Sequence, residues 1–173
     1  DIIKQVGIAK GTFYYYFKSK QAILAALVEH LGEKMRTHFI SIVDQQTLTA
    51  IEKLQLMLRG DQKESISQST VMDIVHHPDN RELQQQLNMF TIEQIAPLIA
   101  SVLEQGNQEG VFNIDNAVET VQIILAGSLF VLDSGLFQWD ENKQIVLLGS
   151  LQRILETMLG VERGRLGFIS EQE

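Results

Sequence analysis

Five side chains that can hydrogen-bond or stack lie close together near the start of the 173-residue chain: Lys10, Thr12, Tyr14, Tyr15 and Tyr16. All three tyrosines of the chain are in this group. Lysine and threonine can hydrogen-bond to base edges, threonine and tyrosine can contact the thymine methyl group, and tyrosine hydroxyls can reach phosphates. A short helix that presents these groups together would fit the major groove of double-stranded DNA.

An ordinary buried aromatic cluster is the alternative explanation of the same residues. Phe13 to Phe17 are five consecutive aromatic residues. Because successive side chains on a helix are rotated by about 100°, five in a row cannot all point inward, and at least two must face outward. Outward-facing rings beside lysine and threonine favour DNA recognition over a plain core.

Two short helices around a glycine turn are predicted to hold these residues. Gly7 can take the left-handed conformation that ends the first helix, and Ile8 follows as a buried turn residue. The side chains that can close a small core are Ile2, Ile3, Val6, Phe13 and Phe17. The pattern therefore predicts a helix-turn-helix.

The charge is distributed unevenly along the chain. The formal net charge is −8, which by itself disfavours nucleic-acid binding. Residues 1–20, however, contain four lysines and one aspartate, so they carry +3 and the remaining 153 residues carry −11. This asymmetry indicates a small basic DNA-binding element on an acidic body.

Residues 7–20, Gly-Ile-Ala-Lys-Gly-Thr-Phe-Tyr-Tyr-Tyr-Phe-Lys-Ser-Lys, resemble the helix-turn-helix of TetR-type transcriptional regulators. That family's pattern is G-[VI]-[SA]-x-[GP]-T-[LFI]-Y-x-[HY]-F-x-[SN]-K, and every constrained position is met here. The resemblance implies contacts to base edges and nearby backbone, and to phosphates through Tyr16 and Lys20; the residues carried over are Lys10, Gly11, Thr12, Tyr14, Tyr15, Tyr16 and Lys20. Backbone amides at the helix start beside Lys20 would add to its phosphate site.

The resemblance also implies a segment before residue 1. Family members carry a basic leader and a first helix, whereas this sequence opens inside the second helix of the motif. We therefore expect this chain to be a trimmed or partly ordered version of a longer protein whose first helix braces the DNA-binding helices.

The rest of the chain predicts an all-α fold. Apolar residues recur at spacings of three and four, and prolines occur only at positions 78 and 97. A long helix is expected from Ser19 to about Asp44, with an apolar stripe of Ile23, Leu27, Leu31, Met35 and Phe39 that Leu24 and Val28 widen. Further helices are expected from near 47 to 59, over 62–76, and from 80 to 106 with an interruption at Pro97.

Two long helices are expected after a turn at Gly106 to Gly110, the first over about 115–137 and the second over about 141–159. The segment from Glu104 to Phe112 also resembles a loop that many TetR-type regulators carry between their seventh and eighth helices. The predicted units are a DNA-binding segment at 1–44, a ligand-binding and dimerisation domain at 45–160, and a loosely ordered tail at 161–173.

The last two helices are the expected dimer interface, as the resemblance implies. Gly127, Ser128, Gly149 and Ser150 would allow close helix approach in a four-helix arrangement. The interface candidates are Leu125, Gly127, Ser128, Leu132, Leu148, Gly149, Leu151 and Leu155. Packing within one chain is the alternative, and Ile145 and Ile154 are expected to point inward. A palindromic operator needs two recognition helices about 34 to 36 Å apart, which favours a homodimer.

An inducer is expected in the body, since the resemblance implies a domain that encloses a small molecule. Adaptable thioethers and aromatic rings line pockets for flat apolar molecules. The candidates are Met57, Met72, His76, Met89, Phe90 and Trp139, each of which could instead be plain core. Asp73 and His77 have a helical i, i+4 spacing, but nothing identifies a further ligand, so we expect no metal and no cofactor.

Several functional classes are disfavoured. The chain has no cysteine, no apolar run that reaches membrane-spanning length, no export signal, and no phosphate loop, HExxH or nucleophile-elbow motif. An enzyme or a membrane protein is therefore not expected, and a cytoplasmic location is. The sequence predicts a sequence-specific transcriptional repressor that a small-molecule inducer releases from its operator; the alternative is a helical dimerisation or ligand-binding module without DNA binding.

Overall fold

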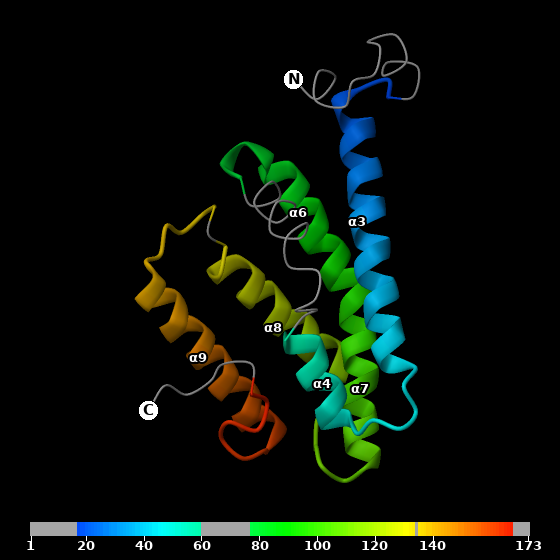
Figure 1. Cartoon of the computed structure of the whole chain (residues 1–173), viewed down its shortest axis with the longest axis vertical. Helices are drawn as coiled ribbons and strands as arrows, with labels where there is room; N and C mark the ends of the chain where they lie inside the picture. Colours follow the sequence, from blue (N-terminus) through cyan, green and yellow to red (C-terminus); the bar gives the residue numbers. More distant parts are fainter. Residues whose placement is uncertain (1–16, 60–76, 134, 168–173) are drawn as a thin grey trace.

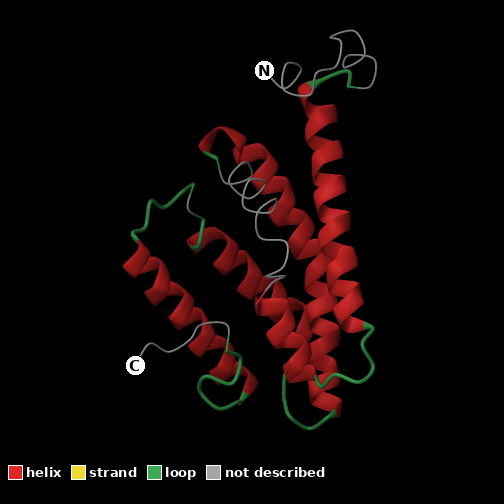
Figure 2. Cartoon of the chain, in the orientation of Figure 1, coloured by secondary structure: helices red, strands yellow, loops and turns green. Residues whose placement is uncertain are grey.

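The computed structural model describes residues 17–59, 77–133 and 135–167, and within these ranges every regular element is helical (Figures 1 and 2). The α-helices are α3 (Lys20–Val43), α4 (Ala50–Arg59), α6 (Arg81–Phe90), α7 (Ala96–Gln108), α8 (Ala117–Val131) and α9 (Glu141–Leu159). A 3₁₀ turn at Pro78–Asn80 precedes α6, and a π-helical turn at Thr91–Ile95 joins α6 to α7. The predicted all-α fold is confirmed.

Helix α3 begins and ends at the residues that the sequence predicts. Ser19 is its N-cap, with extended backbone and a hydroxyl that accepts a hydrogen bond from the Ala22 amide at 3.1 Å. Asp44 closes the other end, where its amide bonds to the Ile40 carbonyl. Leu24, Val28 and Leu31 of the predicted apolar stripe pack against α6, as expected. Leu27 was predicted in the same stripe but is exposed, so the prediction is wrong at that position.

The main core joins α4, α7 and α8. Its buried side chains come from these helices, from α9 and from the connections around them: Ala50, Leu54, Ala96, Ala100, Val102, Leu103, Phe112, Ala117, Val121, Leu159 and Leu166. Helix α4 begins with a capping box: the Thr49 amide donates to the Glu52 carboxylate, and the Glu52 amide donates to the Thr49 hydroxyl. The Thr49 amide, and then its hydroxyl, lower the pKa of the Glu52 carboxyl.

A polar clamp formed by Lys53, Gln105 and Glu109 fastens the far end of α3 to α7. The buried Lys53 ammonium donates to the Val43 carbonyl at 2.7 Å and to Gln105 Oε1 at 2.8 Å. Gln105 Nε2 donates to the Leu48 carbonyl and to Glu109. The Glu109 carboxylate in turn accepts from the Ala50 amide at 3.1 Å, so the clamp also holds the start of α4.

The predicted turn after α7 starts later than expected. Gly106 lies inside α7, and its carbonyl accepts from the amides of Val111 and Phe112 as the chain folds back. Gly110 alone of the predicted turn residues has a positive φ, of 73°. Gly106 is needed for a different reason: a Cβ there would lie 1.9 Å from the Phe112 ring. The predicted turn is therefore wrong for residues 106–108, which belong to α7, and Gly106 serves close packing.

Helix α8 ends at Val131, six residues before the predicted Phe137. The expectation is wrong because Asp133 turns the chain: its Oδ1 accepts hydrogen bonds from the amides of Gly135 and Leu136. The predicted second helix is confirmed as α9, with Asp140 as N-cap and Gly160, at φ 69°, as C-cap.

The prediction of a loosely ordered tail is wrong for residues 161–167. Leu166 has no exposed surface, and its amide donates to Glu156 Oε1 on α9 at 3.1 Å. Gln55 and Arg59 of α4 donate to the carbonyls of Arg165 and Gly167. This segment therefore ties α9 to α4, which apolar periodicity could not reveal.

Candidate functional site

Helix α3 starts where the predicted DNA-binding motif ends. Lys10, Gly11, Thr12, Tyr14, Tyr15 and Tyr16 lie outside the described residues, and Lys20 is the first residue of α3. Twenty-four residues at about 1.5 Å each give α3 a length of about 36 Å. This single helix follows the motif in the sequence and runs along the body (Figure 1).

The body contacts α3 most closely through α6. Leu24, Val28 and Leu31 of α3 pack against Leu83 and Leu87 of α6. Gly32 adds a tighter contact, since a Cβ at this position would lie 2.7 Å from the Phe90 ring. The side chain of Phe90, a candidate ligand residue, is therefore part of the α3–α6 contact.

The π turn at Thr91–Ile95 confirms the predicted interruption at Pro97. In this turn the Ala96 amide donates to the carbonyl of Thr91, five residues back. The Thr91 hydroxyl donates to the Leu87 carbonyl at 2.9 Å. From α8, Gln122 Nε2 donates to the Ile92 carbonyl at 3.4 Å. We name this arrangement, Thr91–Ile95 with Pro97 and Gln122, the π joint.

The other ligand candidates lie in separate parts of the fold. Met57 packs against the main core, and Met89 is exposed on α6. Trp139 stacks on Phe137 with ring centroids 5.1 Å apart, and its indole N–H donates to the Val131 carbonyl. Met72 and His76 lie outside the described residues. A ligand role for these six residues therefore stays a prediction.

Helices α8 and α9 carry large apolar side chains that no residue of the described ranges covers. Ile123 is 74% exposed, Ile145 55% and Ile154 58%; Phe130 and Val146 are also exposed. The inward orientation predicted for Ile145 and Ile154 is therefore wrong within the single chain. We name this surface the open face.

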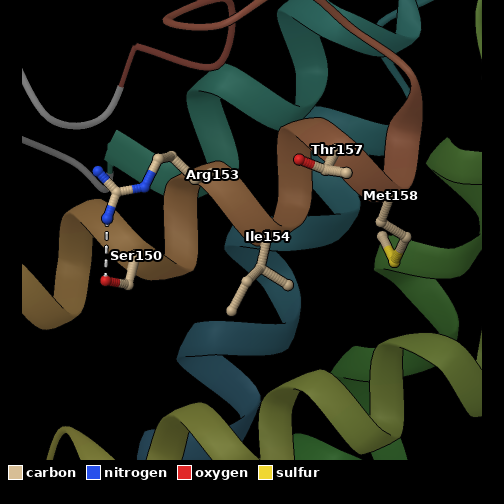
Figure 3. A pocket seen from close by; sticks show the side chains of 5 residues that line it. All are labelled: Ser150, Arg153, Ile154, Thr157 and Met158. Atoms are coloured by element: carbon tan, nitrogen blue, oxygen red, sulfur yellow. Dashed lines mark hydrogen bonds between the residues drawn. The ribbon is translucent and has the colours of Figure 1, made fainter.

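The predicted interface residues divide between the open face and the interior. A Cβ added at Gly127 or Gly149 would meet no atom within 4 Å, so both glycines are accessible to an approaching helix. Leu125 and Leu155 instead pack against the main core, and Ser128, Leu132, Leu148 and Leu151 are half-buried. A shallow hollow of about 460 Å³ runs along α9, lined by Ser150, Arg153, Ile154, Thr157 and Met158 (Figure 3).

None of the helices within residues 17–59, 77–133 and 135–167 combines the length and hydropathy that crossing a membrane requires.

Two family models match the chain. Residues 1–27 match the model described as bacterial regulatory proteins, tetR family, and residues 63–154 match the tetracyclin repressor-like C-terminal domain.

Individual relatives agree with these models. The chain is 30% identical over 153 residues to the fatty acid metabolism regulator protein of Bacillus subtilis, an alignment that covers 83% of this chain and 73% of that protein. It is 26% identical over 135 residues to the transcriptional repressor KstR2 of Mycobacterium tuberculosis, covering 76% of this chain and 66% of the relative. A third relative, the uncharacterized regulator YvdT of Bacillus subtilis, is 55% identical over 31 residues, or 18% of this chain and 16% of its own length.

The chain belongs to the TetR family of bacterial transcriptional regulators. It is accordingly a DNA-binding regulator, as its helix-turn-helix motif predicts. Members of this family bind DNA operators and typically act as dimers that respond to small-molecule ligands.

Proposed function

We propose that this protein is a homodimeric repressor, located in the cytoplasm, that leaves a palindromic operator when an inducer binds in its body. In this proposal residues 1–44 bind DNA and residues 45–160 bind the inducer and dimerise. The observation that carries it is the family match of residues 1–27 and 63–154, with α3 as the continuous helix that leads out of the first matched part toward the body. The dimer brings two recognition helices to the spacing of successive major grooves.

Release requires that the inducer bind more tightly to the state that cannot bind DNA. An ordinary allosteric coupling of about 1 to 3 kcal/mol would lower operator affinity by about 5- to 150-fold. The contact of α3 with α6 supports a route for this coupling, because a ligand that displaces α6 would also displace α3.

The inducer that we propose is a fatty acid or a derivative with a long apolar chain. Support comes from the relative that regulates fatty acid metabolism, which aligns with 83% of this chain. Operator binding measured with added fatty acids of increasing chain length tests this assignment. Release that is independent of chain length would contradict it.

Lys20→Ala in the full-length protein should weaken binding to all DNA sequences and reduce the slope of log affinity against log salt by about one unit for each protomer, or about two for the dimer. Fluorescence anisotropy at two salt concentrations against the intergenic DNA beside the gene measures both effects. Lys34→Ala is the matched control, since this exposed lysine lies about 21 Å further along α3.

Thr12→Ala should instead change the preference at particular base pairs, because threonine is proposed to contact base edges. If Lys20→Ala and Lys34→Ala behaved alike, the phosphate role of Lys20 would be wrong. If the unmodified protein showed no salt-sensitive operator binding, the module without DNA affinity would be the better assignment.

Ile123→Asp should convert the dimer to a monomer, because a carboxylate at the centre of an apolar interface would be desolvated without a partner. Ile154→Asp should act in the same way from α9. Light scattering coupled to size-exclusion chromatography measures the mass in solution. Leu56→Asp, at an exposed leucine of α4, is the control that should remain dimeric. A dimeric Ile123→Asp variant with wild-type operator affinity would exclude the open face as the interface.

A further inference from the structure

The π joint contains a backbone carbonyl that the helix itself cannot satisfy. In an α-helix the Ile92 carbonyl would accept from the Ala96 amide, but that amide is bonded to Thr91. In a π-helix the donor would be residue 97, and Pro97 has no N–H. Gln122 of α8 supplies the donor instead, through its Nε2 at 3.4 Å.

Proline explains why the turn is widened at this point. In an unbroken α-helix the ring of Pro97 would clash with the carbonyl of Glu93, four residues earlier. The wider π turn relieves that clash and leaves Pro97 in the first turn of α7. The hydrogen bond from Gln122 is longer than the 2.7 to 3.2 Å typical of N–H···O bonds, so the cap is weak. A widened turn with a weak, detachable cap can bend with little loss of bonding.

The neighbours of the π joint determine what its bending would move. Phe90 precedes the turn directly and packs on Gly32, while Leu83 and Leu87 pack on the N-terminal half of α3. The other end of α3 is fastened to α7 by the polar clamp. As Figure 1 shows, α6 approaches α3 obliquely and α7 continues alongside it. Bending at the joint therefore moves α6 together with the N-terminal half of α3, which the polar clamp does not hold, while α7 stays in place.

We infer that the π joint is the hinge that sets the orientation of α3, with Gln122 as the positioning residue that holds it in the observed state. Bending of the joint is a property of the body alone; its effect on DNA binding rests on the proposed function. Detaching the Gln122 cap would loosen α6 and let α3 leave the orientation that fits the operator.

A double-variant experiment on the full-length protein without ligand tests the hinge. Gln122→Leu removes the donor and should speed hydrogen exchange of the amides of residues 91–96 by about fivefold, the loss expected for one net hydrogen bond. Pro97→Ala provides a backbone N–H for the Ile92 carbonyl, so Gln122→Leu should have no effect in its presence. Gln94→Leu is the matched control, because this glutamine is exposed in the same turn.

A second readout follows the movement itself. The chain has no cysteine, so spin labels at Glu29→Cys and Gln85→Cys, both exposed, report the distance between α3 and α6. Gln122→Leu should broaden this distance distribution and weaken operator binding, and Pro97→Ala should reverse both changes. Equal effects of Gln122→Leu with and without Pro97→Ala, or an unchanged distance distribution, would overturn the inference. Because exchange and distance are measured without DNA, failure of operator binding in the unmodified protein would count against the proposed function alone.

Discussion

Gly106→Ala should lower the free energy of unfolding by about 3 kcal/mol, the upper end of the usual cost of overpacking a core. The added methyl group would lie 1.9 Å from Cδ2 and 2.3 Å from Cε2 of Phe112. Phe112 is buried, and its amide is bonded to the Gly106 carbonyl, so the ring cannot simply move aside. Urea denaturation at fixed protein concentration measures the change.

The double variant Gly106→Ala/Phe112→Leu tests the cause of this loss. A smaller side chain at position 112 leaves room for the methyl group, so the double variant should be more stable than the sum of the two single changes predicts. Strict additivity would show that the loss does not come from the contact between Gly106 and Phe112.

Gly32→Ala should weaken operator binding by about tenfold, within the range of ordinary allosteric coupling. The new methyl group would lie 2.7 Å from two atoms of the Phe90 ring. Relieving this overlap requires α3 and α6 to move apart. A palindromic operator accepts a narrow range of recognition-helix separations, so displaced α3 helices should fit it poorly. Anisotropy titration of the full-length dimer measures the affinity.

Phe90→Leu is the compensating change for Gly32→Ala. It replaces the ring that the methyl group meets with a shorter side chain, so the double variant should regain much of the operator affinity. If Gly32→Ala lowered the urea midpoint and left operator affinity intact, the α3–α6 contact would serve packing only.

The helix ends that sequence predicted well are those with a side-chain cap or a left-handed residue. Ser19 begins α3, and Asp140 and Gly160 bound α9, because each satisfies orphan backbone groups locally. Pro97 likewise predicted the interruption between α6 and α7. Such features depend on a few neighbouring residues, so a sequence pattern reveals them.

The features that the sequence did not predict depend on contacts with residues that are distant in the sequence, or on an interface. The apolar pattern continues past Val131, but Asp133 bends the backbone there. Ile145 and Ile154 have core-like spacing although they are exposed, since periodicity does not distinguish a chain's own core from an interface. Leu166 looks like part of a polar tail, but it packs in the main core and its amide bonds to Glu156, ten residues away. In the sequence, Gln122 is only a polar residue that interrupts an apolar run. Its role as a hydrogen-bond donor to the Ile92 carbonyl depends on the fold, which brings residues 92 and 122 together.

The position of Gly32 along α3 makes the helix a lever arm. Lys53 fixes the helix at Val43, Gly32 lies eleven residues from that point, and Lys20 lies twenty-three. At about 1.5 Å per residue these arms are about 17 Å and 35 Å, a mechanical gain of about two. A shift of about 1 Å where Phe90 pushes would therefore become about 2 Å at the DNA end of each arm. Two symmetric arms could change their separation by up to about 4 Å, against an operator spacing of about 34 Å.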